Sequence, residues 1–177
     1  MSLKKGEFTF DPKERGEYWG GYVDTFRVYS YSPIPKGVSL ELIKNIKGVE
    51  GGIWTEYIDS DHFDEMIFPK FMALAEVAWT QPSLRNWKDF STRLGHYHLP
   101  RFDYYGLNYR LPSPGYKITS SELFANVAFP GLILRYTLDG LLPTIQSTLF
   151  VKPVEIGNKV VTMCTFNVLQ RNSCMSL

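Results

Sequence analysis

Apolar and polar positions follow two different periods along the chain, and the change falls near residue 112. Before it, apolar residues recur at helical intervals between residues 60 and 79, at Phe63, Ile67, Phe71, Leu74, Ala75 and Ala78. This spacing predicts a helix from Ser60 or Asp61 to about Trp79 with one buried face. Pro69 falls inside it and should kink the helix or divide it from a short leading turn.

Two further helices and one strand are predicted in the same part. A short apolar stripe follows Ser39, an expected N-cap, and ends at Gly48. Another helix should run from about Ser83 or Asn86 to Gly95. Residues 53–58 are β-branched and aromatic and follow two glycines, which favours a strand. The order helix, strand, helix is a fragment of parallel α/β architecture. We expect residues 100–114, which are rich in proline, to be a tether.

From residue 116 the pattern has period two and is interrupted by turn residues such as Asp139-Gly140 and Gly157-Asn158. It predicts strands at Tyr116–Thr119, Leu132–Thr137, Ser147–Val151 and Val160–Asn167, with a weaker pattern at Leu123–Asn126. Short antiparallel strands about ten residues apart indicate a small all-β, immunoglobulin-like sandwich. We therefore predict two domains, residues 1–111 and 112–177.

Composition restricts the function classes. The chain has 177 residues, 44% hydrophobic, 21% charged and 15% aromatic, with a formal net charge of +1. No basic block is present, so no nucleic-acid partner is expected. No apolar run reaches the roughly 18 residues of a membrane span, and the first residues lack the apolar core of a signal peptide. Cys164 and Cys174 have no metal-ligand spacing, and no cofactor or metal is expected. The two cysteines could form a disulfide, but we expect free thiols.

The candidate binding residues are Trp54 and Glu56. On a strand, residues two apart project from the same face. An indole ring can pack on the C–H face of a pyranose while a carboxylate accepts hydrogen bonds from its hydroxyls. Spacing alone favours the plainer alternative of a core tryptophan beside an edge glutamate.

Several motifs resemble a known family. They are Tyr18-Trp-Gly-Gly-Tyr-Val-Asp, Gly51-Gly-Ile-Trp-Thr-Glu-Tyr-Ile and the Pro-x-x-x-Ala-x-Ala-Glu-x-x-Trp pattern from Pro69 to Trp79. Together they resemble the C-terminal end of a family 20 glycoside hydrolase, the β-N-acetylhexosaminidases. The stretch Phe129-Pro-Gly-Leu-Ile-Leu-Arg-Tyr-Thr-Leu-Asp-Gly140 resembles the small β domain appended to bacterial hexosaminidases and chitobiases.

The resemblance implies a fold and a site. The catalytic domain of that family is a (β/α)8 barrel, and the Trp-x-Glu strand is its eighth, so residues 1–111 would hold its last βα unit. Trp54 would form a wall of the pocket around a terminal N-acetylhexosamine, and Glu56 would accept hydrogen bonds from O4 and O6. Glu76 matches the pattern too, but we expect it to anchor helix packing, because its helix would lie outside the barrel.

The family's catalytic residues are not expected in this chain. The family uses substrate-assisted retaining catalysis, in which an Asp-Glu pair in a His-x-Gly-Gly-Asp-Glu motif assists the substrate's own acetamido group. That motif is absent from the sequence. Asp64-Glu65 should be first-turn helix acids, and His62, His96 and His98 lack a catalytic partner at any motif spacing.

The expected protein is therefore the C-terminal piece of a longer hydrolase, since a barrel takes about 250 residues. Alone it should be inactive and should self-associate through apolar surface meant for the rest of the barrel. The expected partners are an N-acetylhexosamine-containing glycan and the remainder of that barrel, with the parent exported to a bacterial periplasm or surface. The alternative is a non-catalytic module that binds glycan or braces a barrel.

Overall fold

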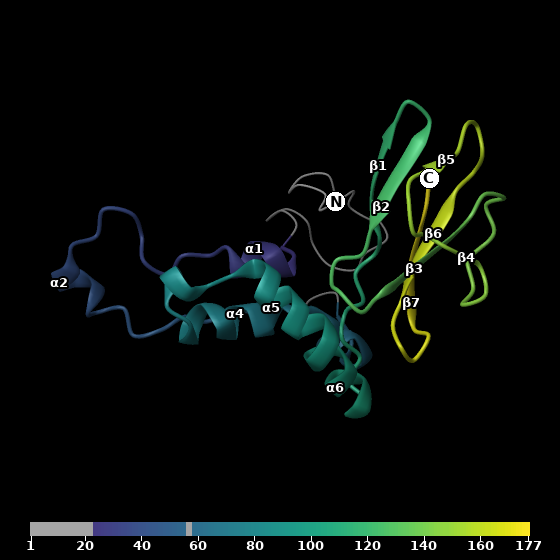
Figure 1. Ribbon diagram of the computed structural model, residues 1–177. Helices are drawn as coiled ribbons and strands as arrows, with labels where there is room; N and C mark the ends of the chain where they lie inside the picture. The colour runs from purple at the N-terminus through teal and green to yellow at the C-terminus, as the bar shows by residue number, and fades with distance from the viewer. Residues whose placement is uncertain (1–22, 56–57) are drawn as a thin grey trace.

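The computed structural model describes residues 23–55 and 58–177. Helices fill the first part of these residues, and strands fill the part from residue 115 (Figure 1). The helical elements are α1 (Thr25–Tyr29), α2 (Leu40–Ile43), the 3-10 turn η1 (Ser60–His62), α3 (Phe63–Ile67), α4 (Lys70–Trp79), the 3-10 turn η2 (Pro82–Leu84), α5 (Trp87–Arg93), the π-helix η3 (Leu94–His98) and α6 (Leu99–Tyr104).

The helix predicted from residue 60 to residue 79 is present and is divided at Pro69, as expected. α3 ends at Ile67 and α4 begins at Lys70, with a cis peptide bond between Phe68 and Pro69. The third predicted helix is also confirmed. The Asn86 side chain caps α5 by accepting a hydrogen bond from the Asp89 backbone N–H at 3.2 Å.

Two other predictions fail. The helix expected over residues 39–48 is reduced to the single turn α2, which projects away from the other helices (Figure 1). Its Leu40 and Leu42 are exposed, so no packing stabilises a longer helix. The strand expected at residues 53–58 is not formed in its described part, where Ile53–Thr55 are irregular. A strand needs a neighbour to pair with, and the described residues before 115 contain no other strand.

Residues 100–114 are not a tether. α6 occupies residues 99–104, and the chain then returns along the helices, where the backbone N–H of Arg110 bonds the carbonyl oxygen of Phe68 at 3.0 Å. Tyr109 is fully buried and Leu111 nearly so. Pro100 lies in the first turn of α6 and Pro114 is fully buried, so these prolines do not separate the segment from the core.

The β part has two antiparallel sheets. One has the order β1-β2-β5 and the other β4-β3-β6-β7. The strands are β1 (Gly115–Thr119), β2 (Glu122–Asn126), β3 (Ile133–Thr137), β4 (Thr148–Leu149), β5 (Val154–Glu155), β6 (Thr162–Phe166) and β7 (Asn172–Ser176). Leu123, Leu134 and Met163 come from both sheets and share one core. All five strands predicted from period two are present, while β5 and β7 were not predicted.

The expectation of free thiols is wrong. Cys164 on β6 and Cys174 on β7 are directly paired in the strand register and form a disulfide. The sequence pattern missed β7, and with it the register that places the two sulfur atoms side by side.

The two parts share a core. One cluster of buried residues joins the helices to the β2–β3 connection: Tyr29, Ala73, Phe90, Leu94, Leu99, Phe102, Tyr109, Leu111 and Phe129. Phe129 belongs to the β part by sequence, yet it is buried among these helical residues, with its ring centroid 6.5 Å from that of Trp87. The helices and the sheets are therefore packed against each other and not merely linked.

Candidate functional site

Trp54 lies on an irregular segment and is highly exposed, with 78% of its surface accessible. Glu56, the other predicted binding residue, lies outside the described residues. The structure therefore places one of the two predicted residues and does not test their pairing. Trp54 is not buried among the described residues.

The segment that carries Trp54 is packed closely on α4 at its start. A Cβ atom on Gly51 would lie 3.0 Å from Leu74 Cδ2 and 3.0 Å from Phe71 Cζ. A side chain at this position would require Leu74 and Phe71 to shift slightly, so glycine favours the close approach of the segment to α4.

After Trp54 the chain turns into η1. The backbone N–H of Ile58 donates to the carbonyl oxygen of Thr55 at 3.2 Å. Asp59 then caps η1, accepting from the backbone N–H of His62 at 3.1 Å and contacting the His62 ring at Nδ1. The carboxylate partner of His62 therefore belongs to a helix cap, and the expectation that His62 lacks a catalytic partner stays a prediction.

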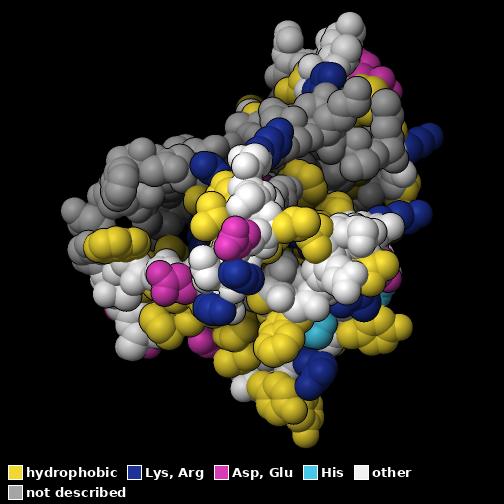
Figure 2. Space-filling view, turned by 90° about the vertical axis from the view of Figure 1, so that its left-hand side faces the viewer, with side chains coloured by type: hydrophobic (Ala, Val, Ile, Leu, Met, Phe, Trp, Pro, Cys, Tyr) yellow, Lys and Arg dark blue, Asp and Glu magenta, His cyan; other side chains and the backbone are white. Residues whose placement is uncertain are grey.

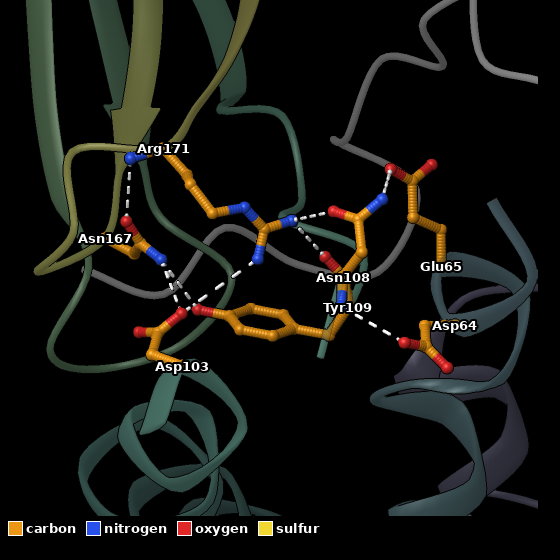
Figure 3. A network of polar contacts seen from close by, with 7 residues as sticks. All are labelled: Asp64, Glu65, Asp103, Asn108, Tyr109, Asn167 and Arg171. Carbon is orange, nitrogen blue, oxygen red and sulfur yellow. Dashed lines mark hydrogen bonds and ion pairs between the residues drawn. The ribbon is translucent and has the colours of Figure 1, made fainter. Parts of the chain in front are cut away.

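Asn108 is hydrogen-bonded to the start of α3 (Figure 3). Its side-chain amide donates to the Asp61 carbonyl oxygen at 2.9 Å and to Glu65 Oε1 at 3.1 Å, and its backbone N–H donates to Asp64 Oδ2 at 3.2 Å. Asp64 and Glu65 are therefore first-turn acids that also bind Asn108. They anchor the start of α3.

Arg171, in the connection between β6 and β7, reaches across to the helical part (Figure 3). One guanidinium nitrogen donates to Asn108 Oδ1 at 2.7 Å and to the Tyr109 carbonyl oxygen at 2.8 Å. The guanidinium carbon also lies 4.7 Å from the centroid of the Tyr109 ring, in cation–π range. Arg171 of the β6–β7 hairpin is thus bonded to Asn108, which in turn bonds the start of α3.

Asn167 completes this network. Its amide donates to Asp103 Oδ1 at 2.9 Å and to the Tyr109 hydroxyl at 3.0 Å, and its Oδ1 accepts from the Arg171 backbone N–H at 2.9 Å. Burial raises the pKa of Tyr109 to about 12. Burial also raises the pKa of Asp103, although hydrogen bonds and the charge of Arg171 act in the opposite direction. The donors and acceptors are paired with one another, so the network is suited to holding segments together.

Glu76 anchors helix packing, as predicted. Its carboxylate accepts from Arg93 Nη2 at 2.8 Å and is mostly buried, which ties α4 to α5. Of the other two histidines, His96 is exposed and His98 is partly buried. Burial, followed by the charges of Arg101 and Arg93, lowers the pKa of His98.

Large apolar side chains remain exposed on the helical part. Figure 2, which faces the α2 end, shows hydrophobic side chains lying open between charged ones. The most exposed are Trp79 at 90%, Leu40 at 87% and Tyr104 at 84%. Among the described residues, none forms a helix long and apolar enough to cross a membrane. In the same residues, no group of three or more His, Cys, Asp or Glu could hold a metal ion.

Two family models match the chain in succession. Residues 7–82 match the catalytic domain of glycosyl hydrolase family 20, and residues 98–173 match the chitobiase/beta-hexosaminidase C-terminal domain. The chain combines the end of a family 20 catalytic domain with this C-terminal domain. The resemblance stated from the motifs is confirmed.

Similar proteins carry names that agree with these matches. A beta-hexosaminidase of Porphyromonas gingivalis is 31% identical over 156 residues, which cover 83% of this chain and 20% of that protein. An N,N'-diacetylchitobiase of Vibrio harveyi is 26% identical over 89% of this chain and 24% of its own length. A beta-N-acetylhexosaminidase of Cellulomonas fimi is 37% identical over 58% of this chain and 22% of its length. The chain spans between a fifth and a quarter of these relatives.

The sequence pattern did not reveal the network of Asn108, Asn167 and Arg171. These residues lie in segments without periodicity. Apart from the bond between Asn167 and Arg171, their side-chain hydrogen bonds join residues 43 to 64 positions apart. Only the Asp64-Glu65 pair was noticed, and it was correctly assigned to the first turn of a helix.

Proposed function

We propose that this chain forms the C-terminal part of a β-N-acetylhexosaminidase, which removes terminal non-reducing N-acetylhexosamine residues by substrate-assisted retaining catalysis. The observation that carries this proposal is the succession of the two family matches, together with relatives named as hexosaminidases and a chitobiase. In this proposal the helical part is the last βα unit of a (β/α)8 barrel. The β part is an immunoglobulin-like sandwich.

The division between the domains is proposed at residues 111 and 112. Tyr109 and Leu111 are buried in the helical core, whereas Tyr116 packs against the core between the sheets. The strand expected at residues 53–58 would form only when the seventh and first strands of the barrel lie beside it. The irregular backbone of Ile53–Thr55 in this chain is compatible with that requirement.

In the same proposal, Trp54 forms a wall of the sugar pocket and Glu56 accepts hydrogen bonds from the outer hydroxyls of the sugar. The open indole of Trp54 supports its part, because a ring that binds a sugar cannot be buried in the protein core. Each hydrogen bond from a sugar hydroxyl to the Glu56 carboxylate would be worth about 1.5–3 kcal/mol.

The catalytic Asp-Glu pair would come from sequence outside this chain. Asp64 and Glu65 are poor candidates for that role, because they lie in the first turn of α3 and outside any His-x-Gly-Gly-Asp-Glu motif. We therefore expect the chain alone to have no hexosaminidase activity. The exposed apolar residues of the helical part would contact the rest of the barrel, and without it they would favour self-association.

We also propose export of the parent protein to a bacterial periplasm or cell surface. The Cys164–Cys174 disulfide supports export, because structural disulfides persist in oxidising compartments.

The test compares the intact hydrolase with variants in a chromogenic N-acetylglucosaminide assay. Trp54→Ala and Glu56→Gln should each raise KM by about tenfold, the equivalent of about 1.4 kcal/mol of binding. Tyr105→Ala and Glu41→Gln remove an exposed ring and an exposed carboxylate elsewhere, and both should leave KM unchanged. An intact protein without hexosaminidase activity would contradict the proposed function. Unchanged KM values for both pocket variants would contradict the proposed roles.

The β part is better suited to bracing the helical part than to binding glycan separately. Phe129 is buried in the helical core, and Arg171 is bonded to Asn108 and Tyr109. Both contacts would be lost if the β part moved independently.

A further inference from the structure

The segment that begins at Gly51 and carries Trp54 is called the sugar-binding segment below. A short series of contacts connects the β6–β7 hairpin to it. The segment lies against α4 at Gly51, before Trp54, and the chain continues through η1 into α3. Asn108 holds η1 and α3 through three donated hydrogen bonds. The only acceptor on the Asn108 side chain is used by Arg171. The Asn108 amide is therefore oriented by three side-chain bonds, and Arg171 supplies the one to its oxygen.

Arg171 is itself well held. Its backbone N–H donates to Asn167, its guanidinium bonds Asn108 and the Tyr109 carbonyl oxygen, and its ring contact is with Tyr109. The guanidinium also lies 4.0 Å from the buried carboxylate of Asp103. The disulfide between Cys164 and Cys174 spans the same hairpin. The β6–β7 hairpin thus places the guanidinium of Arg171 against the side chain of Asn108.

We propose that Arg171 is a positioning residue for the sugar-binding segment, acting through Asn108. This inference rests on the proposed function. If Arg171 is removed, the amide of Asn108 loses one of the three side-chain bonds that orient it, and its bonds to Asp61 and Glu65 weaken. The start of α3 then loosens, and the loosening extends back along the chain toward Trp54. A lysine at position 171 keeps a positive charge near Asp103, but its side chain is one atom shorter, so its ammonium does not reach the place from which Nη2 of Arg171 bonds both acceptors.

The experiment uses the intact hydrolase and two variants that break the same bond from opposite sides, Arg171→Lys and Asn108→Ala. Arg135→Lys is the matched control. Arg135 also lies in the β part and is half-buried, but it bonds the carbonyl oxygen of Ser147 within that part. Arg171→Lys and Asn108→Ala should raise KM at least about fivefold with kcat lowered less than about twofold, because a loosened binding wall weakens substrate and transition state alike. Arg135→Lys should leave KM within about twofold of the unchanged enzyme even where it lowers Tm equally.

Hydrogen exchange gives a readout that does not depend on activity. The amides of residues 58–68 should exchange faster in Arg171→Lys and Asn108→Ala than in the unchanged protein and in Arg135→Lys. Unchanged KM and unchanged exchange in the first two variants would overturn the proposal, as would an equal rise of KM in Arg135→Lys. If the intact protein has no hexosaminidase activity, the proposed function fails. In that case the exchange of residues 58–68 still tests the coupling between Arg171 and α3. Faster exchange in Arg171→Lys and Asn108→Ala supports the coupling, and unchanged exchange overturns it.

Discussion

A Cβ atom on Gly95 would lie 1.9 Å from the carbonyl oxygen of Pro130. The π-helix η3 and the turn between β2 and β3 therefore touch backbone to backbone. Gly131 lies in the same contact. Its φ is +87°, and a Cβ atom added to it would lie 3.2 Å from the Gly95 carbonyl oxygen. This approach allows Phe129, the residue before Pro130, to be buried in the helical core.

Gly95→Ala should therefore destabilise the chain. Alanine is the better helix former by about 1 kcal/mol, but its methyl group would force the turn away from η3. Overpacking of this kind costs about 1–3 kcal/mol, and partial loss of Phe129 burial would add to it. We expect a net loss of about 1–3 kcal/mol, measured as a lower Tm and a lower denaturant midpoint. Gly48→Ala is the control, because its Cβ would meet no atom within 4 Å. Equal effects at both positions would contradict the contact.

Arg93 bonds two carboxylates in different surroundings, which gives a comparison within one cluster. It contacts Glu76 on α4 at 2.8 Å and Asp89, one turn earlier on α5, at 2.9 Å. The Glu76 side chain is 15% exposed and that of Asp89 is 64% exposed. Glu76→Ala should lower stability by about 1–2 kcal/mol, because it separates two helices and leaves Arg93 partly buried. Asp89→Ala should cost about 0.3–0.5 kcal/mol. Chemical denaturation measures both, and a larger cost for Asp89→Ala would be inconsistent with this ranking.

The helices were predictable where an apolar stripe meets a core. α4 and α5 were found because their buried faces recur at helical spacing and because Pro69 and Asn86 mark their limits. The helix after Ser39 failed for the converse reason. Its stripe is real in the sequence, but in this chain it has nothing to pack against and only one turn remains.

The candidate site was predictable as a motif but not as a geometry. Trp54 and Glu56 were singled out by their spacing, which assumes a strand, and a strand depends on neighbours that local sequence does not supply. The contacts that hold the segment were not predictable at all. Asn108 and Arg171 lie in irregular stretches, and each bonds residues more than 40 positions away. Period and turn chemistry carry no information on such pairs.

The disulfide should contribute measurably to stability. It closes a short loop, with a sequence separation of 10 between Cys164 and Cys174, which corresponds to about 2–3 kcal/mol in the chain-entropy account. The double variant Cys164→Ala, Cys174→Ala should lower Tm, and adding a reductant should lower the Tm of the unchanged chain by a similar amount while leaving the variant unaffected. Thiol titration of the denatured, unreduced chain should find no free thiol. Two free thiols, or a Tm insensitive to reductant, would show that the bond is not formed.

Asp103 should make stability depend on pH, because burial raises its pKa in the folded chain. A carboxyl group with a raised pKa binds its proton more readily when folded. It therefore contributes stability that is fully present below its ordinary pKa of about 3.9 and is lost as pH rises through the raised value. Asp103→Asn is neutral at every pH and keeps an oxygen that can accept from Asn167. The free energy of unfolding of this variant, relative to that of the unchanged chain, should therefore increase as pH rises from about 3 toward neutrality.

The measurement is a series of denaturant titrations from about pH 3 to pH 7 on both proteins. Asp89→Asn is the control, since it removes the same charge from an exposed position on α5. A relative stability of Asp103→Asn that falls with rising pH would show that the charge of Arg171, 4.0 Å from the carboxylate, outweighs burial. That result would reverse the sign of the Asp103 contribution, because a lowered pKa stabilises above the ordinary value and fails in acid. The sign of the slope thus decides whether burial or the Arg171 charge governs this carboxylate.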